Sequence, residues 1–178
     1  MLGEGAAVLV LESEDAAAAR RATALGEIVG YGVSTDNYHL TQPDPSGIGP
    51  KLAMERALTD AAIDPASVDY VNAHGTATVF NDATEGKAIS ELMPGVAISS
   101  TKSMMGHALG GAGAIEAVFS LLAILHQFIP PNINFRQPES DWTFRVVGNE
   151  EEPAKLQRVI SNSFGFGGAN ATLVLQAA

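Results

Sequence analysis

Short apolar runs that are typical of buried strands alternate with helical patterns through the middle of the chain. The runs at 67–73 and 96–101 are each followed by a helical pattern, and two further runs at 158–163 and 169–176 come last. Parallel strands need a long crossover connection, which a helix usually provides. The alternation therefore predicts an α/β fold with a largely parallel central sheet, closed by a hairpin on the glycine-rich turn 164–168.

A histidine stands after each of the two central strands, within a glycine-flanked motif. His74 lies in the segment 72–78, Asn-Ala-His-Gly-Thr-Ala-Thr, and His107 ends the segment 100–107, Ser-Thr-Lys-Ser-Met-Met-Gly-His. A lone histidine is more often structural than catalytic. Two neutral imidazoles at neighbouring strand ends, however, can aim two N–H donors at one developing oxyanion. A helix N-terminus after His107 favours its neutral form, so the pair is predicted to be catalytic.

Two threonines, one lysine and one glutamate are the other candidates near these motifs. Residues two apart in an extended segment share a face, so His74, Thr76 and Thr78 are expected to line up and hold a polar substrate arm. Lys102 is either a solvated loop lysine or an internal cation near the site. Glu116, alone on an apolar helical run, is either a surface residue or a buried group that needs a partner, and Lys102 is a candidate.

In the rest of the chain, the spacing of apolar residues, helix-capping residues and turn residues predict further strands, helices and one loop. In chain order they are a strand at 6–11, a helix from the N-cap Ser13 to near Gly26, a strand at 27–34, a turn-rich loop from Thr35 to Pro50, a helix through Met54 and Ala61, a helix opened by an Asp82–Glu85 capping box and ending near Met93, and an apolar helix from Leu109 to Gln127. His39 in the loop and His126 at a helix end are predicted to be structural.

The composition excludes several classes of protein. The net charge is −10, and the ten Lys and Arg residues are scattered, so no basic stripe is present to neutralise nucleic-acid phosphates. The sequence opens without a charged signal-peptide region, and its longest membrane-like run, Ala117 to Leu125, is far shorter than the about 20 residues of a membrane span. We expect a cytoplasmic protein that interacts with neither nucleic acid nor membrane.

The residue types also limit the chemistry. The chain has no cysteine, which excludes disulfides, thiolate metal sites and a thiol nucleophile within it. No third ligand stands at metal-binding spacing near His74 or His107, so no metal site is predicted. The run from Gly165 to Asn170 lacks the last glycine of a dinucleotide fingerprint and lies between strands, and no phosphate-binding Gly-Lys-Ser/Thr motif is present.

Three motifs in a fixed order resemble the C-terminal half of β-ketoacyl-(acyl carrier protein) synthases, in particular the discrete elongating enzymes of type II fatty acid synthesis. They are the segments 72–76, 99–107 and 161–168, and the resemblance runs nearly from end to end. It implies a thiolase-like fold, layered αβαβα and built from two similar halves. By this resemblance residues 1–34 end the N-terminal ketosynthase half, and residues 35–178 form the C-terminal half.

The resemblance also implies a reaction, decarboxylative Claisen condensation. In this family a cysteine accepts an acyl group from acyl carrier protein, malonyl carrier protein loses carbon dioxide, and the resulting enolate attacks the acyl thioester. No separate cofactor is implied, because phosphopantetheine on the carrier protein holds the substrates. The implied partners are acyl carrier protein, the N-terminal ketosynthase half and a second copy of the full enzyme in a homodimer.

Roles carry over to the residues that match the family motifs. His74 and His107 stabilise the enolate oxygen, and Lys102 with Glu116 controls the charge around His107. The substrate-binding set is Thr76 and Thr78 for the pantetheine arm and Phe164, Gly165, Phe166 and Gly167 on the glycine loop, where Phe166 resembles a gate for the second substrate.

Two alternatives remain beside the enzyme. The first is a non-catalytic subunit of a ketosynthase heterodimer, of the chain-length-factor type, although a scaffold has no need of both His74 and His107. The second is a truncated piece with a structural role only. Since the nucleophilic cysteine belongs to the other half, we expect this chain by itself to be inactive in condensation.

Overall fold

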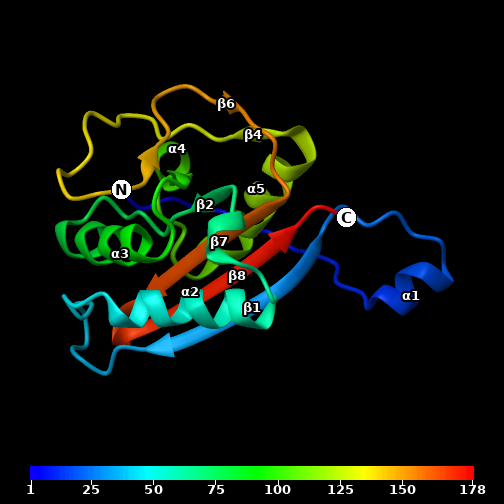
Figure 1. The fold of residues 1–178 in the computed structure, drawn as a ribbon, viewed down its shortest axis with the longest axis horizontal. Coiled ribbons are helices and arrows are strands. Elements are labelled where there is room, and N and C mark those ends of the chain that lie inside the picture. The colour runs from blue at the N-terminus through cyan, green and yellow to red at the C-terminus, as the bar shows by residue number, and fades with distance from the viewer.

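A six-stranded sheet forms the centre of the molecule in the computed structural model, which describes all residues from 1 to 178. The strand order is β1-β8-β7-β2-β3-β5, and β8 is the strand that runs antiparallel to its neighbours, while β7, β2, β3 and β5 pair in parallel. β4 and β6 form a separate two-stranded ribbon. Figure 1 shows the three long strands β1, β8 and β7 side by side. The predicted parallel sheet with a closing hairpin is confirmed.

The helices and strands have the following bounds. The helices are α1 (Glu14–Ala19), α2 (Ile48–Asp60), α3 (Val79–Leu92), α4 (Lys102–Met105) and α5 (Ala112–His126). The strands are β1 (Glu27–Thr35), β2 (Tyr70–Asn72), β3 (Ala97–Ser99), β4 (Phe128–Ile129), β5 (Arg145–Val146), β6 (Glu152–Pro153), β7 (Arg158–Gly165) and β8 (Ala169–Gln176).

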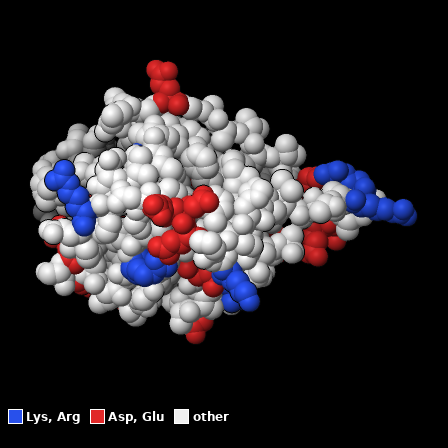
Figure 2. Space-filling model, turned by 90° about the horizontal axis from the view of Figure 1, so that it is seen from above, with Lys and Arg blue, Asp and Glu red and all other residues white.

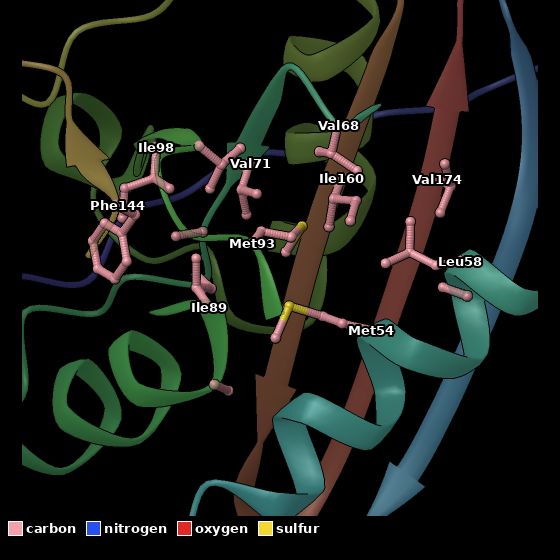
Figure 3. Packing of buried hydrophobic residues seen from close by; sticks show 14 residues of the cluster. Met54, Leu58, Val68, Val71, Ile89, Met93, Ile98, Phe144, Ile160 and Val174 are labelled. Atoms are coloured by element: carbon pink, nitrogen blue, oxygen red, sulfur yellow. The ribbon is translucent and has the colours of Figure 1, made fainter. Parts of the chain in front are cut away.

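Two hydrophobic cores lie on the opposite faces of the sheet. One contains Met54 of α2 and Ile89 of α3 with Val71 of β2 (Figure 3), and the other contains Ile124 of α5 with Tyr70 of β2. Neighbouring strand residues thus alternate between the two cores, as the period of two in a pleated strand requires. Each fully buried side chain of this size contributes about 1.5–3 kcal/mol to stability. The result is a helix–sheet–helix sandwich, as the α/β prediction requires.

The N-terminal segment departs from the prediction. Residues 6–11 form no strand, and Val8 and Val10 are 88% and 87% exposed, because no other strand runs beside them. Ser13 does cap α1 by accepting a hydrogen bond from the Ala16 amide, but the helix ends at Ala19 rather than near Gly26. None of its residues is buried, so no packing extends it. Figure 1 shows α1 standing away from the body.

Two other boundaries also differ from the prediction. α2 begins at Ile48, inside the predicted loop 35–50. The Asp82–Glu85 capping box is wrong, because α3 begins at Val79 after Thr78 and the carboxylate of Glu85 is turned into the protein. Its new partners belong to the site described below.

One helical stretch, Leu109–His126, has the length and the apolar composition of a membrane span. The central helix of a globular protein meets the same criterion, and here α5 packs against β7 and β8 and carries the buried Glu116. The charged surface agrees with the sequence: Figure 2 shows Lys and Arg on one face as separate patches rather than as a stripe.

Candidate active site

The two predicted histidines lie side by side at one edge of the sheet. β2 and β3 are parallel neighbours with Asn72 opposite Ser99, and each histidine follows the end of one of them. The ring centroids of His74 and His107 are 5.4 Å apart, and the ring planes are 83° apart. Two imidazoles in this edge-on arrangement can reach one atom placed between them. The predicted convergence of the two strand ends is confirmed.

His74 is buried, and a tight turn sets the direction of its ring. Gly75 has a φ of +43°, and a Cβ atom there would lie only 2.5 Å from the Cβ of Ser100, so the position requires glycine. The Ser100 hydroxyl donates to the Gly75 carbonyl at 3.0 Å. On the other side, the Phe164 ring lies 5.7 Å from the His74 ring. The Nδ1 atom of His74 is buried without a hydrogen-bond partner.

Hydrogen bonds of both its backbone amide and its backbone carbonyl fix His107. Its amide donates to the Met1 carbonyl at 3.0 Å, and its carbonyl accepts from the Gly3 amide at 3.0 Å. Its ring Nδ1 accepts a hydrogen bond from the Leu109 amide at 3.2 Å. A neutral ring that accepts at Nδ1 carries its proton on Nε2. His107 therefore offers an N–H donor on the side away from the turn that leads into α5.

Both rings are neutral at physiological pH. Burial, with smaller effects of the Lys102 and His107 charges, lowers the pKa of His74 to about 3. Burial and the Lys102 ammonium also lower the pKa of His107 below its usual range. A neutral imidazole is a hydrogen-bond donor that can stabilise a developing negative charge without first losing a proton.

Lys102 and Glu116 form a buried ion pair beside the two rings. The Lys102 ammonium donates to Oε1 of Glu116, and the two side chains are 4% and 2% exposed. The open question about each residue is thereby answered: Lys102 is an internal cation and Glu116 is its buried partner. Burial raises the pKa of Glu116 to about 7 although Lys102 opposes this shift.

The two threonines meet, but not through an extended segment. Their hydroxyls are 2.9 Å apart and exposed. Gly75 and Ala77 both have positive φ, so the strand-like alternation predicted for residues 74–78 is wrong. A cavity of about 580 Å³ adjoins Thr76, Lys102 and His107. Thr76 therefore lies beside an open space at the site, and its hydroxyl contacts that of Thr78, although His74 itself is buried.

The glycine loop between β7 and β8 carries the most exposed aromatic ring. Phe166 is 81% exposed, and Gly167 and Gly168 that follow have φ values of +77° and +76°. The Gly167 amide donates to the Leu40 carbonyl at 2.7 Å, and the Gly168 carbonyl accepts from the Asp36 amide at 2.9 Å. The turn-rich loop that begins at Thr35 therefore holds this glycine loop by its backbone.

Sequence reasoning missed Glu85. Its buried carboxylate accepts hydrogen bonds from the amides of His74 at 2.8 Å and Gly75 at 2.9 Å. The spacing between Asp82 and Glu85 predicts a helix cap. The signal that could have identified the role of Glu85 is an acidic residue on the inner face of α3. His39 and His126 are both exposed.

The comparisons with known proteins all assign this chain to the same family. Residues 25–136 match the family model described as "Beta-ketoacyl synthase, C-terminal domain". The chain is 49% identical over 179 residues to 3-oxoacyl-[acyl-carrier-protein] synthase 2 of Coxiella burnetii, an alignment that covers 98% of this chain. It spans only 43% of the length of that relative.

Solved structures agree with this result. The structure of the ishigamide ketosynthase/chain length factor has a TM-score of 0.95 at 40% identity. The match covers 100% of this chain and 44% of that one. A type II polyketide ketosynthase in complex with its acyl carrier protein has a TM-score of 0.89 at 34% identity, with 94% of this chain and 42% of that one covered. The predicted thiolase-like fold is thereby confirmed.

Proposed function

Because this chain belongs to the β-ketoacyl synthase family, we propose that it carries the decarboxylating half of a ketosynthase active site. The proposed reaction joins an acyl thioester to malonyl-acyl carrier protein during fatty acid or polyketide chain elongation. The observation that carries this proposal is the pair of neutral imidazoles, His74 and His107, whose centroids are 5.4 Å apart. They supply two N–H donors where the reaction develops charge.

The donors act on the malonyl thioester. The bond between the malonyl carboxylate and the adjacent carbon breaks, carbon dioxide leaves, and the electron pair moves onto the thioester oxygen as an enolate. His74 and His107 each donate a hydrogen bond to this oxygen. Preorganised donors of this kind are worth about 10²- to 10³-fold in rate each. The enolate carbon then attacks the acyl thioester, and the enzyme thiolate is the leaving group.

Lys102, paired with Glu116, reinforces the effect of burial, which is the main reason that the two donors are uncharged. The Lys102 ammonium is close enough to lower the pKa of both rings, and the Glu116 carboxylate compensates its charge inside the protein. An imidazolium would instead bind the negatively charged malonyl carboxylate and hold the substrate in its ground state. The ion pair therefore acts on the two imidazoles through its charge, without direct contact with substrate.

The remaining predicted residues are proposed to handle the substrate arm. The hydroxyls of Thr76 and Thr78 bond the pantetheine chain at the cavity. Phe164 packs against His74, and Phe166 is the gate for the incoming substrate on a loop made mobile by Gly165 and Gly167. Its exposure suits a gate, and the backbone hydrogen bonds to Asp36 and Leu40 are the contacts that open when the loop swings.

The acyl-accepting cysteine must come from residues beyond these 178, which contain none. The unpaired segment with Val8 and Val10 supports a partner layer, which we propose to be the N-terminal ketosynthase half. Acyl carrier protein and a second copy of the enzyme are the other proposed partners, and the cytoplasm is the proposed site of action. Without the other half, this chain is proposed to be inactive.

The alternative is a chain-length-factor-like subunit without chemistry of its own. One experiment distinguishes the two: the chain is co-expressed with its N-terminal half, and carbon dioxide release from malonyl carrier protein is measured with and without an acyl donor. Decarboxylation that depends on His74 and His107 supports the enzyme. A stable complex without decarboxylation, in the presence of a competent cysteine, would favour the scaffold.

A further inference from the structure

We propose that Ser100 is a positioning residue that ties the two histidine-bearing segments together and so keeps His74 and His107 within reach of one oxygen atom. This inference rests on the proposed function, in which both imidazoles donate to the same enolate oxygen. Ser100 acts through the backbone of the His74 turn, because its hydroxyl donates to the Gly75 carbonyl at 3.0 Å.

The two histidine-bearing segments part where the sheet ends. The last backbone bond at this end of β2 and β3 runs from the Ala73 amide to the Ser99 carbonyl, at 2.9 Å. Beyond it, residues 74–78 lead into α3 and residues 100–107 contain α4. The bond from the Ser100 hydroxyl is the only hydrogen bond between these two segments. Ser100 therefore continues the pairing of the two strands by one further link.

The Ser100 side chain also limits where the His74 turn can lie. A Cβ atom on Gly75 would be 2.7 Å from the Ser100 hydroxyl oxygen, so this side chain rests directly against the Gly75 backbone. Ser100 is buried, and a hydrogen bond shielded from water is stronger than an exposed one. Without the hydroxyl, the Gly75 carbonyl has no donor, and the turn is free to move away from the other segment.

A separate loop fixes the backbone of Ser100. The Ser100 amide donates to Oδ1 of Asn132 at 3.1 Å. The next residue of that loop, Ile133, donates its amide to the Ser103 hydroxyl at 3.1 Å. The start of the His107 segment is thus held at two points by one loop. Ser100 therefore gives the neighbouring turn a fixed point of attachment.

The separation of the two rings decides whether they act as a pair. At a centroid distance of 5.4 Å, one oxygen atom between His74 and His107 can accept from both. A shift of one segment removes one of the two donors, whereas the contacts that bind the rest of the substrate remain. Preorganised donors stabilise charge only while their geometry is held. The loss of the tie should therefore lower kcat, and only while both rings are present.

The test is a double-mutant cycle in the intact two-half enzyme. Ser100→Ala removes the hydroxyl and keeps the Cβ atom, and it is made alone and together with His107→Ala. Ser34→Ala is the matched control, because the Ser34 hydroxyl is also buried and also donates to a glycine carbonyl, that of Gly49, at 2.6 Å. Decarboxylation of malonyl carrier protein gives kcat and KM. Nuclear Overhauser contacts between the two imidazoles report the ring separation directly.

We expect Ser100→Ala to lower kcat by about 10-fold with KM little changed, because a misplacement of about 1 Å at a reacting group can cost on the order of 100-fold. In the His107→Ala background the same substitution should change kcat by less than about 2-fold, since no pair is left to align. The contact between the imidazoles should weaken in Ser100→Ala, and Ser34→Ala should match the wild type. A folded Ser100→Ala enzyme with wild-type kcat, or with an equal loss in both backgrounds, would overturn the inference.

A second variant and the spectroscopic signal keep the two proposals separate. Asn132→Ala, which releases the Ser100 amide, replaces Ser100→Ala if the latter does not fold, and the same outcomes apply to it. If the wild type does not decarboxylate at all, the proposed function fails. The imidazole contact then still decides the role of Ser100: a weaker contact in the variant supports the tie, and an unchanged contact refutes it.

Discussion

The Lys102 ammonium and the Glu116 carboxylate form an ion pair that is almost completely closed to solvent. A buried pair of this kind is weak evidence for stability, because removing two charges from water costs about as much as their attraction returns. It lies beside His74 and His107, where the Lys102 cation adds to the effect of burial in lowering the pKa of both rings.

Loss of either ring should abolish most decarboxylation. In the intact enzyme, His74→Ala and His107→Ala should each lower the rate of carbon dioxide release from malonyl carrier protein by about 10²- to 10³-fold. His39→Ala is the control, because His39 is exposed in a loop. Near-normal release by either of the first two variants would remove the role assigned to the pair.

The stability of the fold should depend on pH through His74. Its pKa is about 3 in the folded protein and about 6.5 in the unfolded chain, so the folded state binds fewer protons between these values. Its contribution to stability is therefore complete above pH 6.5 and is lost by about 1.4 kcal/mol per unit as the pH falls toward 3.

The measurement for His74 is urea unfolding at pH 7 and pH 5. Glu116 acts in the opposite direction between pH 4.5 and 7, because its raised pKa makes the folded state bind more protons there. The informative quantity is therefore the difference between the wild type and His74→Gln. If both proteins lose the same free energy of unfolding on acidification, His74 is not the group responsible.

Phe166→Ala should change substrate transfer and leave the fold intact. The ring is 81% exposed, so we expect a change in the free energy of unfolding within about 0.5 kcal/mol. Pre-steady-state acyl transfer from carrier protein to the intact enzyme should change in rate or in substrate order. Unchanged transfer kinetics with an unchanged melting temperature would show that the ring is not a gate.

The free edge of β1 should be protected by two side chains of α2. The Tyr31 amide donates to Oδ2 of Asp60 at 3.0 Å, and the Arg56 guanidinium donates to the Val33 carbonyl at 2.6 Å. These bonds occupy backbone groups that could pair with another strand. The double variant Arg56→Ala/Asp60→Ala should self-associate in light scattering, whereas Glu55→Ala on the same helix should remain like the wild type.

The exposed segment at 6–11 should make the chain associate when no other half is present. Val8 and Val10 have no packing partner, and unpartnered apolar segments drive oligomerisation. Val8→Thr/Val10→Thr should reduce the apparent mass in size-exclusion chromatography. A chain that melts sharply as a monomer without these substitutions would contradict this expectation.

Local patterns sufficed for much of the fold. Three features are visible in the sequence: the strand β1, the hairpin of β7 and β8, and the apolar helix α5. Each of them has a local pattern of apolar or turn residues that indicates the element directly. The two histidines could be placed together because parallel strands end at the same edge. The lone charge on an apolar helix made the Lys102–Glu116 pair one of two alternatives for each residue, and the structure decides between them.

Several of these errors share one physical reason: the decisive partner lies outside the local pattern, or is missing. Val8 and Val10 look like a strand, but a strand exists only beside another strand. Asp82 and Glu85 have the spacing of a helix cap, but Glu85 bonds the His74 turn instead. Gly75 has a positive φ where Ser100 approaches it closely, and no local pattern indicates that approach.

The pairing of Met1 and Gly3 with His107 has a kinetic meaning. His107 is held by residues far from it in sequence, and such long-range contacts form late because chain entropy opposes them. The local β7–β8 hairpin forms without them. The backbone of His107 is therefore anchored only where the first three residues lie beside it, and a change in their position would reach the second imidazole directly.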